Sequence, residues 1–269
     1  MQRWGSMPDG AARLERAFRD AGRPLFIPYV MGGYPDVPTS LRYARALAQH
    51  ADVIELGVPF SDPLADGPTI QAAGQRALDA GTTPQDVLDM ANTIRAGPPV
   101  VVMTYLNVVL AHGARVFLER AAAAGVAGVV IPDLPVDESD EVLGHADRAG
   151  VALVPFAAPT SSDERLEAIG RRARGFVYCV AVTGVTGGEI SVDAVLTDYL
   201  SRARARIDAP LAVGFGVRTA RDAAEVGRLA GGVIIGGQLV RLIDTAESVE
   251  AAEAALGSFG GEVRAALGG

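Results

Sequence analysis

No lysine occurs among the 269 residues of this chain, and all 24 basic residues are arginine. A Schiff base to a carbonyl substrate or to pyridoxal phosphate needs the amine of a lysine. The chain can form neither, and it has no lysine to hold a phosphate group. Any chemistry that it performs must therefore use other residue types.

Cysteine and histidine are almost as scarce. The single cysteine, Cys179, rules out a disulfide within the chain. The three histidines, His50, His112 and His145, are scattered, and no pair has the spacing of metal ligands. We therefore expect the chain to hold no metal ion.

Excess positive charge and long hydrophobic runs are missing too. The net charge is −8, which argues against binding to the phosphates of a nucleic acid. The longest apolar stretches, near Val100–Ala111 and Ala121–Ile131, fall short of the ~18 residues that a membrane span needs. The first residues lack the apolar core of a secretory signal. We expect a cytoplasmic protein that binds neither nucleic acid nor membrane.

Short apolar runs rich in valine or isoleucine are what the sequence has in abundance. Eight of them are bounded by glycine or proline, at Leu25–Val30, Val53–Leu56, Val100–Met103, Ala127–Ile131, Ala152–Phe156, Phe176–Val180, Leu211–Val213 and Gly232–Ile235. Stretches with helical periodicity lie between them, such as Leu41–Gln49, Arg115–Ala124, Glu138–Ala149, Asp163–Arg172, Asp193–Arg204 and Ala220–Leu229. Apolar strands that alternate with helices are typical of a parallel sheet.

Eight strand–helix pairs in about 250 residues predict an α/β fold, a single (β/α)₈ TIM barrel that spans residues 1–269 as one domain. A doubly wound sheet is the alternative, but it usually has fewer strands, and the sequence has no G-x-G-x-x-G after its first run. We also expect an extra N-terminal helix at Arg13–Ala21 and a short helix at Gln238–Ile243 after the eighth strand. In such barrels the loops that follow the strands carry the chemistry.

The segment after the second run, IELGVPFSDPLADGPT at residues 54–69, carries three carboxylates. Glu55 lies inside the apolar run, where a carboxylate is costly unless it is functional or forms a salt bridge with an arginine inside the barrel. Asp62 and Asp66 follow in a long loop stiffened by proline, where capping of turns is the alternative role. Two carboxylates at one barrel mouth, without metal ligands nearby, favour general acid and base catalysis.

The last two runs are followed by glycine-rich segments, GFGVRTARD and IIGGQLVRL. Glycines let backbone N–H groups approach an anion, and a helix N-terminus adds partial positive charge. Barrels that bind phosphate often use the loops after these two strands. Gly214, Gly216, Gly236 and Gly237 therefore predict a phosphate site that needs no lysine.

The stretch IELGVPFSDPLADGPTIQAA closely resembles the signature of the tryptophan synthase alpha subunit family. The other motifs follow in a similar order: LFIPYVMGGYP, MTYLN, VTGVTGGE, GFGV and IIGG. The resemblance covers nearly the whole chain. It implies a (β/α)₈ barrel that cleaves indole-3-glycerol phosphate to indole and glyceraldehyde 3-phosphate by a retro-aldol reaction, bound to a beta subunit that carries pyridoxal phosphate.

The resemblance also implies roles for individual residues. Glu55 matches the main catalytic acid and base, and Asp66 matches the second catalytic carboxylate. Asp62 and Asn107 lie where the family meets its beta partner in an α–β–β–α complex, and no cofactor is expected in the chain itself. The substrate-binding positions are matched by Phe26, Tyr29, Tyr105, Tyr178, Gly187, Gly216, Gly236 and Gly237.

Two positions depart from the family pattern. Gly237 stands where many members have a serine whose hydroxyl also contacts phosphate, and Met31 replaces a residue with a hydroxyl group. The backbone donor at position 237 remains, so we expect the phosphate site to persist.

The absence of lysine agrees with the implied chemistry. A retro-aldol cleavage needs an electron sink, and indole becomes its own sink once C3 is protonated, because the ring nitrogen then carries the cation. We expect Glu55 to transfer the protons and Asp66 to accept a hydrogen bond from the ring N–H. Three alternatives stay open: a sugar-phosphate isomerase on the same barrel, a lyase that works without a partner, and a non-catalytic barrel that activates a beta subunit.

Overall fold

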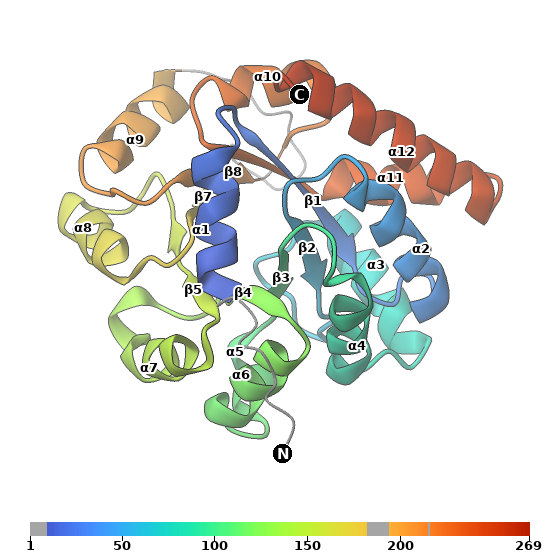
Figure 1. Ribbon diagram of the computed structural model, residues 1–269, viewed down its shortest axis with the longest axis horizontal. Coiled ribbons are helices and arrows are strands. Elements are labelled where there is room, and N and C mark those ends of the chain that lie inside the picture. Colours follow the sequence, from blue (N-terminus) through green and yellow to red (C-terminus); the bar gives the residue numbers. More distant parts are fainter. Residues whose placement is uncertain (1–9, 182–193, 215) are drawn as a thin grey trace.

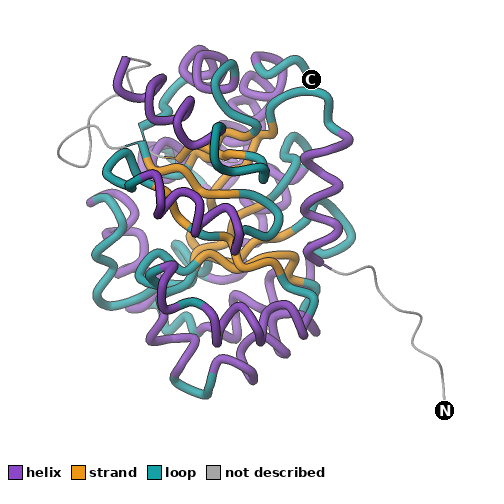
Figure 2. Tube along the Cα trace, turned by 90° about the vertical axis from the view of Figure 1, so that its left-hand side faces the viewer, coloured by secondary structure: helices purple, strands orange, loops and turns teal. Residues whose placement is uncertain are grey.

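Nine parallel strands lie at the centre of the computed structural model, which describes residues 10–181, 194–214 and 216–269. They form one sheet in the order β5-β4-β3-β2-β1-β9-β8-β7-β6. Helices surround this sheet in both views (Figures 1 and 2). The strands are β1 (Leu25–Met31), β2 (Ile54–Gly57), β3 (Val100–Met103), β4 (Val126–Val130), β5 (Ala152–Val154), β6 (Phe156–Ala157), β7 (Val177–Val180), β8 (Leu211–Gly214) and β9 (Gly232–Ile235).

The predicted fifth strand is divided in two by Pro155. Proline has no backbone N–H and therefore interrupts a ladder of hydrogen bonds. Its carbonyl still accepts a hydrogen bond from the Tyr178 N–H at 2.9 Å. Because β5 and β6 form the two ends of the sheet and are joined through one residue, the sheet curls into a nearly closed barrel. The other seven predicted strands are confirmed to within one residue at each end.

The helices follow the strands as expected for a (β/α)₈ barrel. They are α1 (Gly10–Asp20), α2 (Val37–Ala48), α3 (Pro68–Asp79), α4 (Pro84–Ile94), α5 (Leu106–Leu110), α6 (Ala114–Ala123), α7 (Asp140–Ala149), α8 (Asp163–Arg172), α9 (Ala194–Arg204), α10 (Ala220–Gly227), α11 (Gly237–Thr245) and α12 (Val249–Ala266), with a 3₁₀ turn at Val136–Glu138. The extra N-terminal helix and the short helix after the last barrel strand are both present, as α1 and α11. No helix of the described ranges is both long and apolar enough to cross a membrane.

Helices α3, α4 and α5 were not predicted from periodicity. The start of α4 does carry a sequence signal, because Thr83 and Asp86 form a reciprocal capping box around Pro84 at the first turn. Helix α5 has only five residues and too little length for a periodic pattern. Helix α3 directly follows the loop after β2, and α5 begins three residues after β3, whereas α4 packs against β2, β4, α2 and α6.

Side chains of β1 alternate between two buried clusters, as the period of a strand requires. Leu25, Ile27 and Tyr29 belong to the cluster that fills the barrel interior. Phe26 and Val30 belong to the cluster between the sheet and the surrounding helices. This alternation decides which residues of each strand can reach a site at the mouth.

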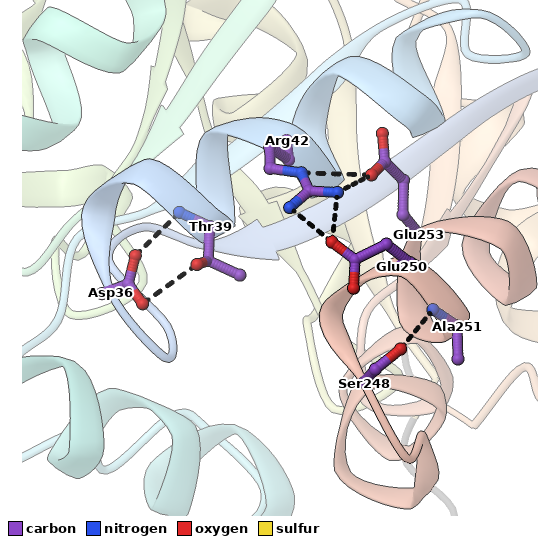
Figure 3. Close-up of polar contacts among 7 residues, drawn as sticks. All are labelled: Asp36, Thr39, Arg42, Ser248, Glu250, Ala251 and Glu253. Carbon is purple, nitrogen blue, oxygen red and sulfur yellow. Dashed lines mark hydrogen bonds and ion pairs between the residues drawn. The ribbon is translucent and has the colours of Figure 1, made fainter.

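Helices α2 and α12 are joined by charged side chains (Figure 3). The guanidinium group of Arg42 lies 3.1 Å from the carboxylate of Glu250 and 2.7 Å from that of Glu253. Asp36 and Ser248 cap the N-termini of the same two helices. The first barrel helix and the last helix of the chain are therefore fixed side by side.

Candidate active site

Glu55 projects from β2 into the barrel interior, because its neighbours Ile54 and Leu56 belong to the outer cluster. The residue is 1% exposed, and neither carboxylate oxygen has a hydrogen-bond partner within the described ranges. No described arginine forms the salt bridge with Glu55 that was the alternative role. Burial raises the pKa of Glu55 from 4.5 to about 8, and the nearby charge of Asp66 adds to this effect. At neutral pH, Glu55 holds a proton.

Asp66 is fixed in the loop after β2 by Tyr105. The Tyr105 hydroxyl donates a hydrogen bond to Oδ2 of Asp66 at 3.2 Å and accepts one from the backbone N–H of Ala65 at 3.1 Å. Burial raises the pKa of Asp66 to about 6, although the hydrogen bond from Tyr105 lowers it. Above that pH Asp66 is ionised, so the two carboxyl groups of the site are in different protonation states at neutral pH.

Two further tyrosines, Tyr29 of β1 and Tyr178 of β7, line the interior beside these carboxyl groups. A Cβ atom on Gly57 would lie 2.0 Å from the Tyr29 hydroxyl, and one on Gly214 would lie 2.5 Å from the Tyr178 hydroxyl. Each ring therefore leans over a glycine of the neighbouring strand, where a larger residue would displace it. Burial raises the pKa of both phenols well above the ordinary value, and the charges of the two carboxylates raise it further.

The glycines of the predicted phosphate site lie on the other side of β1. Strand β1 is flanked by β2, which carries Glu55, and by β9, which leads into Gly236 and helix α11. A Cβ atom on Gly236 would lie 3.2 Å from Cδ1 of Tyr29, and Tyr29 is the register partner of Glu55. The ring of Tyr29 therefore lies between the two ends of the site.

The backbone of this region suits an anion. No described side chain caps the N-terminus of α11, so the N–H groups of its first turn are left for another acceptor. Gly216 has a φ of 87°, a conformation that favours glycine. Gly237 begins α11 and presents its backbone without a side chain.

Comparisons with known proteins show the family of the chain. The model of the family described as tryptophan synthase alpha chain matches residues 16–267. The tryptophan synthase alpha chain of Alkalilimnicola ehrlichii is 48% identical over 266 residues, which cover 96% of this chain and 97% of that one. The chain belongs to the tryptophan synthase alpha chain family.

Solved structures agree with this membership. The structure of tryptophan synthase from Mycobacterium tuberculosis superposes with a TM-score of 0.86 at 37% identity, over 96% of this chain and 97% of that one. Tryptophan synthase subunit alpha from Legionella pneumophila gives a TM-score of 0.87 at 32% identity, over 97% and 99%. As a member of the family, the chain is a carbon–carbon lyase.

One of the predicted substrate contacts is wrong. Phe26 belongs to the outer cluster together with Tyr43 and Leu47 of α2, on the face of β1 opposite to Tyr29. Residues three positions apart on a strand point to opposite faces, so both cannot face the interior. The aromatic side chain that β1 gives to the site is that of Tyr29.

The remaining predicted positions lie in three places. Gly187 falls outside the described residues. Tyr105 contacts Asp66, whereas Asp62 and Asn107 are exposed at the rim, in the loop after β2 and in α5. Their contact with a beta partner stays a prediction.

Four apolar residues near these positions were not predicted to belong to the site. Phe60 stacks on Tyr105 and Phe156 stacks on Tyr178, with ring centroids 4.8 and 4.6 Å apart. Leu64 and Leu110 are 94% and 52% exposed, so two large apolar side chains reach the surface in these segments. A leucine within the otherwise polar stretch SDPLADG was the one signal in the sequence that pointed to Leu64.

Proposed function

We propose that Glu55 is the general acid and base, and Asp66 the acceptor for the indole N–H, in the cleavage of indole-3-glycerol phosphate that this chain catalyses. The products are indole and glyceraldehyde 3-phosphate, and the reaction is the alpha reaction of tryptophan biosynthesis. The observation that carries the proposal is the Glu55 carboxyl, which is buried without a hydrogen-bond partner among the described residues. Glu55 is the register partner of Tyr29, whose ring lies 3.2 Å from where a Cβ atom on Gly236 would be.

The proposed steps use only these two carboxyl groups. Glu55 gives its proton to C3 of the indole, and the ring nitrogen takes the positive charge while its N–H donates to the Asp66 carboxylate. The hydroxyl on the glycerol carbon attached to C3 then gives its proton to Glu55. The bond between that carbon and C3 breaks, its electron pair restores the aromatic ring, and the carbon becomes the aldehyde of glyceraldehyde 3-phosphate. Glu55 ends protonated, ready for another cycle.

The electrostatics of the site support this division of roles. A general acid works best when its pKa lies near the working pH, and that of Glu55 is about 8. Asp66, with a pKa of about 6, is ionised at neutral pH and can stabilise a cationic ring nitrogen. Burial is the main cause of both pKa shifts. The same low-polarity interior keeps the proton on Glu55 and strengthens the attraction between the Asp66 carboxylate and the developing positive charge.

The phosphate group is placed at the start of α11. Gly216, Gly236 and Gly237 would offer backbone N–H groups there, and Gly187, by family resemblance, a further one. Glycine at position 237 supplies a backbone donor but no hydroxyl. Tyr29 and Tyr178 form the walls between this end and the carboxyl groups.

The chain needs no cofactor of its own in this proposal, and pyridoxal phosphate belongs to a beta subunit. The expected assembly is an α–β–β–α complex in the cytoplasm. The exposed Leu64 and Leu110 lie beside Asp62 and Asn107 in the sequence, which supports a protein partner at this rim.

An indole-release assay tests the proposed function. The purified chain should release indole from indole-3-glycerol phosphate, and a beta subunit should increase the rate. Release that does not respond to a beta subunit would favour the partner-independent lyase. Stimulation of a beta subunit without any release of indole would favour the non-catalytic alternative and contradict the proposal.

A further inference from the structure

Two helices begin at the two ends of the site, one next to Asp66 and one at the proposed phosphate position. Helix α3 begins two residues after Asp66, and α11 begins at Gly237. The two helices lie against each other and against β1. Ala73 of α3, Val240 of α11 and Met31 of β1 share one buried cluster, so an apolar layer lies beneath the pair.

A polar triad joins the same two helices through Tyr34, which lies three residues beyond β1. The Tyr34 hydroxyl donates a hydrogen bond to Oδ1 of Asp244 in α11. It also accepts one from Nη1 of Arg76 in α3 at 2.8 Å, and the same nitrogen lies 3.2 Å from Asp244. The guanidinium group of Arg76 sits over the Tyr34 ring, 5.8 Å from its centroid.

The centre of this triad is buried although its charges are not. Tyr34 is 4% exposed, whereas the side chains of Arg76 and Asp244 are 64% and 37% exposed. An exposed ion pair contributes little by itself. Burial and the hydrogen bond to Asp244 raise the pKa of Tyr34 to about 12, so its hydroxyl keeps its proton at any ordinary assay pH. The hydroxyl is therefore the permanent link between the two helices.

We propose that the Arg76–Tyr34–Asp244 triad is a positioning element that sets the separation between the acid–base end and the phosphate end of the site. The inference rests on the proposed function, because it needs Asp66 and the start of α11 to act on one substrate molecule. None of the three side chains needs to contact that substrate. The triad acts through the helices that it joins.

The consequence differs between ligands. Indole-3-glycerol phosphate must reach both ends at once, and a misplacement of about 1 Å between reacting groups costs up to about 100-fold in rate. Glycerol 3-phosphate carries the phosphate but no indole, so it occupies the phosphate end alone. Loosening the triad should impair turnover of the long substrate more than binding of the short ligand.

Tyr34→Phe tests this inference, because it removes the hydroxyl and keeps the ring beneath Arg76. Asp244→Asn is a second variant, which keeps an acceptor but removes the charge. Tyr43→Phe is the matched control: Tyr43 is a buried tyrosine of α2 in the outer cluster, away from both ends of the site. We would measure kcat and KM for indole-3-glycerol phosphate, the Kd for glycerol 3-phosphate, and the Tm of each variant.

We expect Tyr34→Phe to lower kcat/KM about tenfold, mostly through kcat, while the Kd for glycerol 3-phosphate stays within about twofold. Asp244→Asn should show the same pattern more weakly, and Tyr43→Phe should match the parent in all three constants. A kcat/KM for Tyr34→Phe within about twofold of the parent overturns the inference. So does an equal loss of glycerol 3-phosphate affinity, because the triad would then support only the phosphate end.

The experiment distinguishes a failure of the triad inference from a failure of the roles proposed for Glu55 and Asp66. The assay uses turnover by a chain with Glu55 and Asp66 intact, so the comparison of Tyr34→Phe with Tyr43→Phe holds whatever roles those carboxyl groups have. An unchanged Tyr34→Phe variant alongside an inactive Glu55→Gln variant would reject the triad alone. An active Glu55→Gln variant would reject the roles proposed for the carboxyl groups.

Discussion

Replacing Glu55 by Gln should lower the turnover of indole-3-glycerol phosphate by roughly 10²–10⁴-fold, the usual contribution of general acid and base catalysis. Gln has nearly the shape of a protonated Glu, so the barrel should keep its packing. It cannot give a proton to C3 or take one from the glycerol hydroxyl. The effect should appear in kcat, as measured by indole release under saturating substrate.

Binding at the phosphate end should survive this change. The Kd for glycerol 3-phosphate should stay within about twofold, because the backbone of Gly236 and Gly237 is untouched. Glu253→Gln on α12 is a matched control, since that side chain faces Arg42 on the surface, and its turnover should equal that of the parent. Near-normal kcat for Glu55→Gln would reject Glu55 as the group that moves the protons.

The same substitution should stabilise the fold at alkaline pH. The native pKa of Glu55 is raised from 4.5 to about 8, mainly by burial. Below pH 4.5 this carboxyl is protonated in both the native and the unfolded chain. Between pH 4.5 and 8 the unfolded chain ionises while native Glu55 does not, so the free energy of unfolding falls as the pH rises. Above pH 8 the loss is complete.

Glu55→Gln removes this titration. The free energy of unfolding of the variant, relative to the parent, should therefore rise from near zero at pH 4.5 to on the order of 4 kcal/mol at pH 8–9. Urea unfolding of the variant and of the parent at several pH values measures it. A difference that does not change with pH would mean that native Glu55 ionises like an exposed carboxyl.

Most of the barrel could be predicted because parallel strands covered on both sides must be apolar on both faces. Seven of the eight expected strands therefore lie within one residue of their predicted ends. The eighth, Ala152–Phe156, is divided at Pro155. The apolar pattern of the run does not show that a proline without a backbone N–H interrupts the hydrogen bonds between strands. Helix α3 was missed because it begins in a loop of proline and acidic residues rather than with periodic apolar residues.

The site could be predicted from the sequence where a charged residue stands at a position that is expected to be buried and apolar. A glutamate within an apolar run signals function or pairing, and the structure shows that it is buried without a partner among the described residues. Phe26 was misplaced because the family motif does not by itself give the face of the strand. The triad could not be predicted, because Tyr34 meets Arg76 and Asp244 from 42 and 210 residues away in the sequence.

The central claim is that Glu55, as proton donor, and the backbone of Gly236 and Gly237, as phosphate site, bind the two ends of one substrate molecule at the barrel mouth. A crystal structure of the Glu55→Gln variant with indole-3-glycerol phosphate tests it most directly. We expect the phosphate on the N–H groups of Gly236 and Gly237, the indole N–H on Asp66, and C3 about 3–3.5 Å from the side chain at position 55. An indole ring bound away from position 55, with the phosphate still at the start of α11, would contradict the account.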